Sequence, residues 1–264
     1  MVDEIRILAH KHYNQPSVFT PEGLLREARR QKALPAAAVP QVCVLDPDGD
    51  IVRRLASDGA AERDQAWACY HTDLYRYRKD GLELGLIGCA VGAPFAVLVA
   101  EELFATGCRF LISMTSAGQL AALRPPPYFV LIDRAFRDEG TSYHYLAASE
   151  FSQADRGLVG VMEVAFAGAG LPIERGGTWT TDAPFRETEA AVKAMRSRGL
   201  LAVEMEAAAL YAFAAARQQP VLCLAHVTNQ MAQVPGDFEK GEADGTAGAL
   251  AVIATAARAW LKTQ

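Results

Sequence analysis

The sequence predicts a single α/β domain with a central, mostly parallel or mixed sheet flanked by helices. Apolar runs of strand length alternate with helical stretches along the chain, and no repeat, low-complexity tract or long linker divides it. With 264 residues, of which 51% are hydrophobic and 22% charged, the chain can bury one large core. We therefore assign residues 1–264 to one domain and regard residues 1–40 as an N-terminal extension.

The first helix carries a clear start signal. Thr20 is suited to the N-cap and Pro21 to the first helical position, and the helix is expected to end before Pro35. Apolar runs predict strands over 42–45, 84–87, 110–114, 128–132 and 221–227. A turn over 46–50 follows the first of these strands. The remaining helices are expected over 94–106, 154–169, 188–198, 206–217 and 247–261.

Composition favours a small solute as the partner. The net charge of -5 is spread along the chain, which argues against nucleic acid or a membrane surface. The uncharged run 84–100 contains glycines and a proline, and a buried strand, a turn and a helix explain it better than a membrane span. Five cysteines without C-x-x-C spacing predict free thiols, with neither disulfides nor a zinc site. The acidic start of the chain lacks a secretory signal, so we expect a cytoplasmic protein without a metal site.

Glu204 and Glu206 stand between an apolar run and an alanine-rich helical stretch. Residues two apart share a face on an extended segment but not on a helix, so a strand that ends near Glu206 brings both carboxylates together. Carboxylates at the C-terminal end of a strand suit a ligand with vicinal hydroxyls, such as a sugar. The alternative is an acidic first turn that complements the helix dipole.

Five short blocks follow one another along the chain. They are GDIVR at 49–53, GCAVGAP at 88–94, TSAG at 115–118, TTDAPF at 180–185 and EMEAAALY at 204–211. In this order they resemble the nucleoside phosphorylase superfamily, which includes uridine phosphorylases, hexameric purine nucleoside phosphorylases and adenosylhomocysteine-type nucleosidases. Two longer strings, at 137–145 and 178–188, are similar to a uridine-phosphorylase-like branch. The resemblance covers roughly residues 40 to 260.

The resemblance implies cleavage of a nucleoside N-glycosidic bond, which builds positive charge on the ribose and negative charge on the departing base. It implies that Glu206 accepts hydrogen bonds from the ribose hydroxyls, that Met205 packs on the sugar and that Glu204 supports Glu206. Phe185 is placed like the family's aromatic residue near the base. An ordinary core phenylalanine is the alternative.

Recognition of the base falls to three polar residues. Asn229 stands where purine-specific relatives carry an aspartate, and an amide forms hydrogen bonds but cannot act as a general acid. The alternative is a turn asparagine at a strand end. Arg186 can neutralise a uracil-like leaving group or form a surface ion pair, and His144 can bond the substrate or have a structural role.

The region for the attacking group departs in part from the resemblance. The turn with Gly49 and Arg53 is similar to the phosphate-binding turn of the phosphorylases, although three nearby aspartates repel an anion and a solvated surface turn is the alternative. The second family arginine is absent, because Ser113 stands in its place. Ser116 and the backbone at Gly92 can add donors, or can be plain turn residues.

The sequence therefore predicts a nucleoside phosphorylase of the pentosyltransferase class that acts in nucleoside metabolism and nucleotide salvage. It needs no cofactor, takes phosphate as co-substrate, favours a uridine-like nucleoside and forms a homo-oligomer. The catalytic residues are expected to be Glu206, Asn229 and Arg186. A nucleosidase that uses water, and a non-catalytic nucleoside-binding protein of the same fold, are the alternatives.

Overall fold

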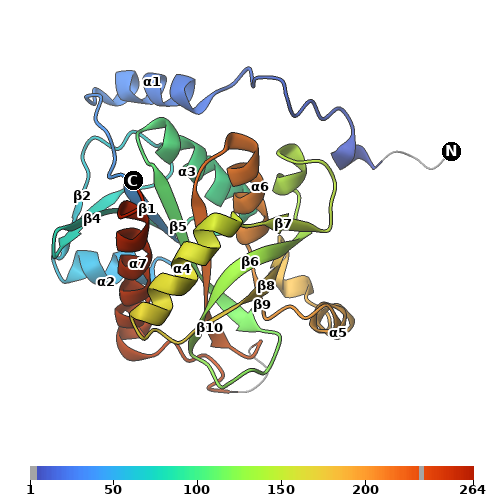
Figure 1. Cartoon of the computed structure of the whole chain (residues 1–264). Coiled ribbons are helices and arrows are strands. Elements are labelled where there is room, and N and C mark those ends of the chain that lie inside the picture. The colour runs from blue at the N-terminus through green and yellow to red at the C-terminus, as the bar shows by residue number, and fades with distance from the viewer. Residues whose placement is uncertain (1–4, 232–234) are drawn as a thin grey trace.

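The computed structural model describes residues 5–231 and 235–264, in which helices surround one large sheet (Figure 1). The described α-helices are α1 (Pro21–Lys32), α2 (Asp50–Ser57), α3 (Ala93–Ala105), α4 (Arg156–Gly168), α5 (Glu189–Ser197), α6 (Ala207–Arg217) and α7 (Thr246–Leu261). The strands are β1 (Val42–Asp46), β2 (Ala61–Arg63), β3 (Tyr75–Lys79), β4 (Leu82–Gly88), β5 (Phe110–Gln119), β6 (Tyr128–Asp138), β7 (Phe151–Gln153), β8 (Ile173–Thr181), β9 (Ala202–Glu204) and β10 (Val221–Asn229). Short 3-10 helices are η1 (Arg6–Leu8), η2 (Thr141–His144), η3 (Pro184–Arg186) and η4 (Glu242–Gly245).

Part of the sheet closes on itself. Strands β5, β10, β6, β8 and β9 form a ring, because β9 pairs with β5 as well as with β8. Strands β1, β4, β3 and β2 extend the sheet from the other half of β5, and β7 pairs with β6. Both parallel and antiparallel pairs occur, so the sheet is mixed, and the prediction of one α/β architecture is confirmed.

Strand β5 changes its neighbour along one edge, and this change prepares a site. Residues 110–113 pair with β1, whereas Gly118 and Gln119 pair with β9. On the opposite edge, β10 pairs in parallel with β5 from Leu111 to Gly118. Residues 114–117 therefore lie where two parts of the sheet diverge, a position at which α/β proteins bind ligands.

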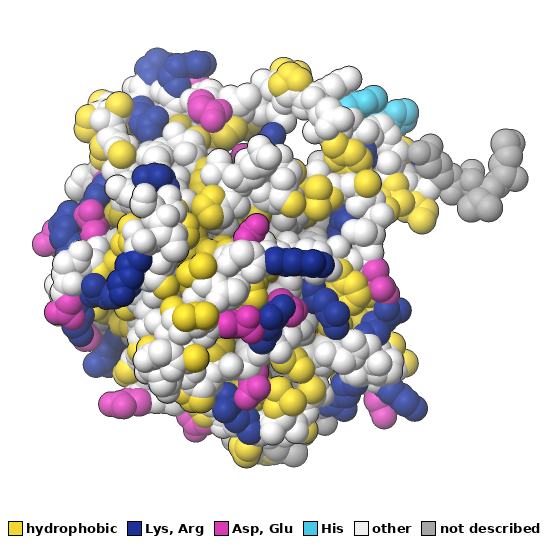
Figure 2. Space-filling model, viewed as in Figure 1, with side chains coloured by type: hydrophobic (Ala, Val, Ile, Leu, Met, Phe, Trp, Pro, Cys, Tyr) yellow, Lys and Arg dark blue, Asp and Glu magenta, His cyan; other side chains and the backbone are white. Residues whose placement is uncertain are grey.

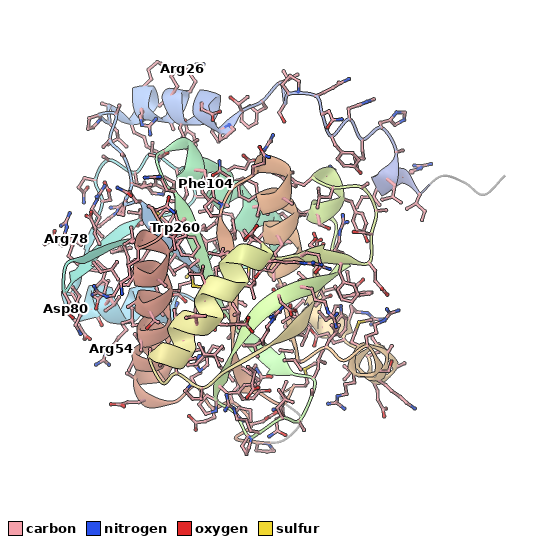
Figure 3. The ribbon with its side chains drawn as sticks, viewed as in Figure 1. Arg26, Arg54, Arg78, Asp80, Phe104 and Trp260 are labelled. Carbon is pink, nitrogen blue, oxygen red and sulfur yellow. The ribbon has the colours of Figure 1, made fainter. Side chains whose placement is uncertain are left out.

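Helices cover the sheet in groups, and the apolar residues between them form the core. On one side α3 packs against α6 and α1, and on the other α7 packs against α4 and α2. Trp260 of α7, labelled in Figure 3, stacks on Phe110 of β5 with ring centroids 5.1 Å apart. The labelled charged residues lie at the periphery in the same view, and on the face shown in Figure 2 charged side chains of both signs are interspersed. No helix among the described residues is long and apolar enough to cross a membrane.

Local sequence signals located most elements. The predicted cap of α1 is confirmed, since Thr20 Oγ1 accepts a hydrogen bond from Gly23 N–H (3.2 Å). All five predicted strands are present, although β5 and β6 extend further than their apolar runs because polar residues continue them. The predicted turn is present at Pro47 and Asp48, and helix α2, which was not predicted, follows it at once with Gly49 as its N-cap.

Strand β8 was not predicted, because two glycines and an arginine interrupt its pattern. The neighbouring chain explains one of those glycines. A Cβ on Gly176 would lie 2.5 Å from Leu201 Cδ1, so the close approach of the two segments requires glycine. Gly176 lowers the strand propensity of this segment, but the packing of β8 against Leu201 requires it.

Tyr211 joins two strands from within the core. Its hydroxyl donates to Ile132 O (2.6 Å) and accepts from Cys223 N–H (3.0 Å), next to the last β6–β10 ladder pair. The hydroxyl bridges backbone groups of β6 and β10 at that point. Tyr211 is 1% exposed, so bulk solvent does not reach these hydrogen bonds.

We expect Tyr211→Phe to lower the free energy of unfolding by about 1–3 kcal/mol, because a buried N–H and a buried C=O lose their partner. Urea denaturation measures this change. Tyr70→Phe is the matched control: its hydroxyl bonds Gln31 Oε1 at the exposed surface, and its loss is expected to change stability by less than about 0.5 kcal/mol. Equal effects of the two substitutions would contradict the bridging role.

Candidate active site

Glu204 is a buried carboxylate at the end of β9 that fastens three elements. Its Oε1 accepts hydrogen bonds from the hydroxyls of Thr178 (3.0 Å) and Thr180, both on β8. Its Oε2 accepts from the backbone N–H groups of Glu206 and Ala207, each at 2.7 Å, at the start of α6. Four donors occupy the acceptor sites of one carboxylate. Glu204 therefore holds the junction of β8, β9 and α6 and has little capacity left for a ligand.

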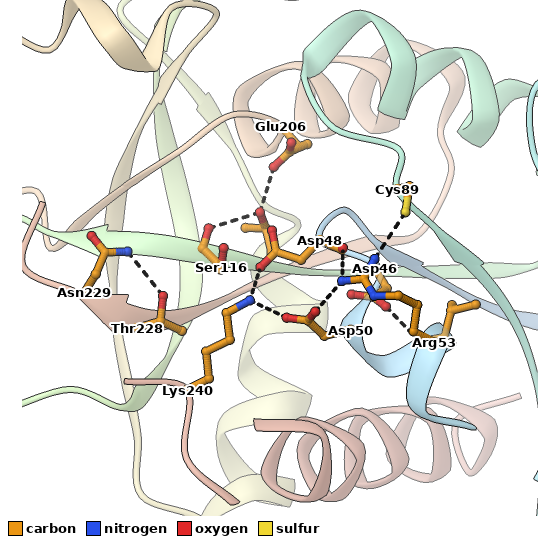
Figure 4. Close-up of polar contacts among 12 residues, drawn as sticks. Asp46, Asp48, Asp50, Arg53, Cys89, Ser116, Glu206, Thr228, Asn229 and Lys240 are labelled. Carbon is orange, nitrogen blue, oxygen red and sulfur yellow. Dashed lines mark hydrogen bonds and ion pairs between the residues drawn. The ribbon is translucent and has the colours of Figure 1, made fainter. Parts of the chain in front are cut away.

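Glu206 is the N-cap residue of α6, and its carboxylate reaches two other elements. Its Oε1 accepts a hydrogen bond from Gly92 N–H (2.7 Å) and its Oε2 from Thr115 Oγ1 (2.9 Å). Figure 4 shows this carboxylate above Ser116. The residue is 1% exposed. Each oxygen uses one acceptor site, so Glu206 can still accept hydrogen bonds from a ligand.

The two carboxylates influence each other's protonation. Burial raises the pKa of Glu206 to about 8, and the negative charge of Glu204 adds to the rise. Burial also raises the pKa of Glu204, although its hydrogen-bond donors oppose the change. The pair therefore carries a proton near neutral pH. A ligand that brings hydroxyl donors to Glu206 stabilises the charged form and promotes release of that proton.

Backbone geometry positions the partners of Glu206. Gly92 has φ 88° and ψ 148°, a conformation that residues with a side chain rarely adopt, and this places its N–H opposite the carboxylate. Thr115 lies on the part of β5 between its β1 and β9 neighbours. Glu206 is therefore held at the point where the sheet divides.

The predicted glycine turn lies beside this point, at the start of α2. Gly49 has φ 77°, and a Cβ there would lie 2.6 Å from Cys89 Sγ, so glycine is required. Arg53 donates to the backbone carbonyl of Asp48 (2.9 Å) and to the carboxylate of Asp50. The guanidinium charge is thus already paired in a largely exposed position.

Lys240 enters the same region from the segment that follows β10. Its Nζ donates to Asp48 Oδ2 (3.3 Å) and to Asp50 Oδ2 (Figure 4). Partial burial opposes its charged form, but the two carboxylates outweigh burial and raise the pKa of Lys240. Burial also raises the pKa of nearby Asp46 to about 6. Three carboxylates therefore share this region with two cations, Arg53 and Lys240.

A small cavity of about 20 Å³ lies between these groups and β5. Its lining includes Ser116, Thr228, His226 and Lys240. The ring of His226 stacks on Phe129 with centroids 4.5 Å apart, and burial together with the charge of Lys240 lowers the pKa of His226 to about 4. His226 is therefore neutral at pH 7. The cavity is thus lined by hydroxyl and imidazole groups, one ammonium group and the carboxylates of Asp46, Asp48 and Asp50.

Several residues predicted for the site meet here. Glu204, Glu206, Gly92, Gly49, Arg53 and Ser116 all lie at or beside the carboxyl ends of β1, β4, β5 and β9. Met205 stands half-buried between the two glutamates. Ser113 differs from these residues: its buried hydroxyl has no hydrogen-bond partner within residues 5–231 and 235–264, and it does not line the cavity. The position of the absent arginine therefore does not face this cavity.

The residues predicted to recognise the base are dispersed. Asn229 is 9% exposed, accepts from Met231 N–H (2.9 Å) and donates to Thr228 Oγ1 (3.2 Å), as a turn asparagine does. Phe185 is 98% exposed, so it is not the core phenylalanine of the alternative, and neighbouring Arg186 is also exposed. His144 Nδ1 lies 2.8 Å from Lys11 Nζ, in the N-terminal extension.

Comparisons with known proteins agree with this architecture. Residues 41–259 match the family model described as the phosphorylase superfamily. This match spans most of the chain. The chain belongs to the phosphorylase superfamily.

Two curated relatives of this phosphorylase-superfamily chain match over part of their length. A guanosine phosphorylase of Halorubrum lacusprofundi is 28% identical over 135 residues, which cover 51% of this chain and 56% of the relative. A purine nucleoside phosphorylase of the DeoD type from Jannaschia sp. is 28% identical over 153 residues, which cover 57% of this chain and 65% of the relative. The chain thus matches less than two thirds of either relative.

Solved structures support the fold. A uridine phosphorylase of Vibrio fischeri complexed with 6-hydroxy-1-naphthoic acid has TM-score 0.71 and 19% identity, with 85% of this chain and 92% of that chain covered. A purine nucleoside phosphorylase of Toxoplasma gondii in complex with immucillin-H has TM-score 0.70 and 18% identity, with 86% and 93% covered. At these identities the likeness establishes the fold of the phosphorylase-superfamily chain and not its substrate.

Sequence reasoning missed three polar residues of the site. Thr115 stands in one of the five recognised blocks, and its place on β5 shows why a hydroxyl is useful beside Glu206. Lys240 and His226 gave no local signal, because each reaches the site only through the fold. Among the described residues, no group of three or more His, Cys, Asp or Glu side chains is arranged to hold a metal ion.

The raised pKa of Glu206 makes stability depend on pH. Because folding raises this pKa above its value in the unfolded chain, the stability contribution is fully present below about pH 4.5 and is lost as pH rises through about 8. Glu206→Gln removes this dependence while keeping the shape. We expect the variant to gain stability relative to the unmodified protein, by a few kcal/mol, between pH 5 and pH 9.

Urea denaturation at pH 5 and pH 9 measures this difference. Glu189→Gln, on the exposed start of α5, is the matched control and should show no such gain. Parallel pH profiles for the unmodified protein and Glu206→Gln would show that Glu206 is ionised throughout.

Proposed function

We propose that this chain cleaves the N-glycosidic bond of a nucleoside, with phosphate as the attacking group. The observation that carries the proposal is the Glu206 carboxylate, buried where the sheet divides, held by Gly92 N–H and Thr115 Oγ1 and still able to accept hydrogen bonds. Membership of the phosphorylase superfamily supports the same reaction class. No cofactor enters the proposal, and phosphate acts only as co-substrate.

The proposed role of Glu206 follows from the charge that develops during cleavage. Its free acceptor sites receive the ribose hydroxyls, and this contact favours the ionised carboxylate. As the glycosidic bond breaks, positive charge grows on the sugar and the buried anion stabilises it at short range. Glu204 acts as a positioning residue, because its donors include the N–H groups of Glu206 and Ala207.

Hydrolysis is the second candidate, and the aspartates near the cavity favour it. Asp48 and Asp50 pair with both nearby cations, so a phosphate dianion meets carboxylates that compete for the same charges. Water carries no charge and meets no such competition. A non-catalytic nucleoside-binding protein is the remaining alternative. Base release that requires phosphate, base release without phosphate, and binding without release distinguish the three.

A uridine-like substrate is the favoured nucleoside in this proposal. Asn229 supplies an amide and cannot donate a proton to a purine as an acid would. Arg186 has an exposed guanidinium suited to an anionic uracil-like leaving group. The relatives include guanosine, purine nucleoside and uridine phosphorylases, so only a substrate panel separates the choices.

The proposal includes a homo-oligomer that works in cytoplasmic nucleoside salvage. Large apolar side chains on the surface support association, since Val18, Phe19 and Phe185 are all more than two thirds exposed. Because Phe185 is exposed, it can contact a base only if a second surface encloses the space beside its ring. Association between copies of the chain provides such a cover.

Glu206→Gln is expected to lower kcat/KM for nucleoside cleavage by about 10²-fold or more, equivalent to about 3 kcal/mol of transition-state stabilisation. Release of free base from a nucleoside in phosphate buffer measures it. Glu189→Gln serves again as the control with unchanged activity. If Glu206→Gln folds and its kcat/KM equals that of the unmodified protein, the role proposed for Glu206 is wrong.

A substrate panel tests the proposed base preference. Uridine is expected to be cleaved faster than inosine or adenosine at equal concentration. Arg186→Ala should reduce uridine cleavage more than inosine cleavage, because a purine leaving group needs a proton rather than a fixed charge. Strong purine preference in the unmodified protein would reject the roles given to Asn229 and Arg186.

A further inference from the structure

The segment that follows β10 carries a cation back to the edge of the sheet. Gln230 N–H donates to Asp237 Oδ1 (2.7 Å), and Glu239 N–H donates to Thr228 O (2.7 Å). These bonds tie residues 237–239 to the end of β10. Lys240 follows directly, so the backbone fixes the root of its side chain beside Thr228.

The ammonium group of Lys240 lies in the region proposed for the nucleophile. It is held between Asp48 and Asp50 and lines the cavity of about 20 Å³ together with Ser116 and Thr228. Thr115 lines the same cavity, and its hydroxyl donates to Glu206. Thr115 thus lies between the cavity and Glu206, the carboxylate proposed to hold the sugar.

Arg53 does not supply the charge inside this cavity. Its guanidinium bonds the Asp48 carbonyl and Asp50 and lies 3.7 Å from Cys89 Sγ, and Arg53 is absent from the cavity lining. Ser113 is buried elsewhere in β5. Among the described residues that line the cavity, Lys240 is the one with a cationic side chain at pH 7.

We propose that Lys240 binds the attacking phosphate in place of the arginine absent at Ser113, and that Asp48 and Asp50 hold the ammonium group until the anion arrives. The inference rests on the proposed function and names the residue that binds phosphate, the proposed co-substrate. The cavity has room for about one water molecule, so phosphate enters only after the lining, with Lys240 in it, rearranges. The flexible four-carbon stem of Lys240 permits that movement while residues 237–239 stay bonded to β10.

The exchange sets the affinity for phosphate. Lys240 gives up a charge-assisted contact with Asp50 or Asp48 and gains one with phosphate, while Ser116 and Thr228 offer hydroxyl donors. Phosphate affinity is therefore reduced by the strength of the ion pairs that it displaces. Loosening the pair with Asp50 strengthens phosphate binding, provided that Lys240 is present. A lysine that only anchors the segment would show no such dependence.

The test measures base release against phosphate concentration for the unmodified protein, Lys240→Met, Asp50→Asn and the double variant. Lys240→Met keeps the length of the side chain and should raise phosphate KM by about tenfold to a hundredfold. Asp50→Asn should lower phosphate KM several-fold, and this gain should vanish in the double variant. Lys193→Met, on the exposed face of α5, is the matched control with unchanged KM.

A second measurement does not need turnover. Phosphate should raise the thermal unfolding temperature of the unmodified protein above its value in KCl of equal ionic strength, and should raise it much less for Lys240→Met. Lys240→Arg keeps the positive charge and should keep the phosphate effect. This variant also shows that loss of phosphate binding does not follow from any substitution at this position.

The outcomes separate the inference from the proposed function. Cleavage with a phosphate KM that is the same in Lys240→Met, or an Asp50→Asn gain that persists without Lys240, overturns the inference and leaves the function intact. No cleavage of any nucleoside, together with Lys240-dependent stabilisation by phosphate, overturns the function and supports the inference. Absence of any phosphate effect on rate or unfolding temperature overturns the inference as well.

Discussion

The Glu204 carboxylate is the interaction on which the rest of the site depends. It receives two threonine hydroxyls from β8 and two backbone N–H groups from the start of α6, so β8, β9 and α6 meet at one buried charge. Burying a charge is costly unless hydrogen bonds replace its water shell, and these four donors do so. Because Glu204 fixes the first turn of α6, Glu206 has a defined direction toward Gly92 and Thr115.

The two halves of the site differ in how their charges are used. On the side proposed for the sugar, Glu206 is buried and retains acceptor capacity, so it is organised before a ligand arrives. On the side proposed for the attacking group, Arg53 and Lys240 are already paired with Asp50 and Asp48. An incoming anion must exchange partners there, whereas a sugar hydroxyl only adds a hydrogen bond. This asymmetry explains why the identity of the attacking group is the point on which the candidate functions diverge.

Much of the fold was accessible from the sequence because its signals are local. The α1 cap depends on Thr20 and a residue three positions away, and the five apolar runs became strands since their side chains are buried on the sheet. Secondary-structure prediction failed where a residue is required by a contact with a segment far away along the chain. Gly176 weakens the strand pattern of β8, yet only glycine allows Leu201 to approach. The α2 helix, which begins within the Gly49–Arg53 block, was not predicted because the residues before it carry a turn signal.

The sequence alone determined the fold class, the start of α1 and the placement of Glu204 and Glu206 at a strand end, because each rests on residues within a few positions of one another. Only the tertiary structure decided which side chains share the site. Thr115 meets Glu206 across 91 residues and Lys240 meets Asp50 across 190, after β5 has changed neighbours from β1 to β9. No local pattern encodes such contacts, since they exist only when the strands have been ordered in the sheet and the chain has returned to the same edge.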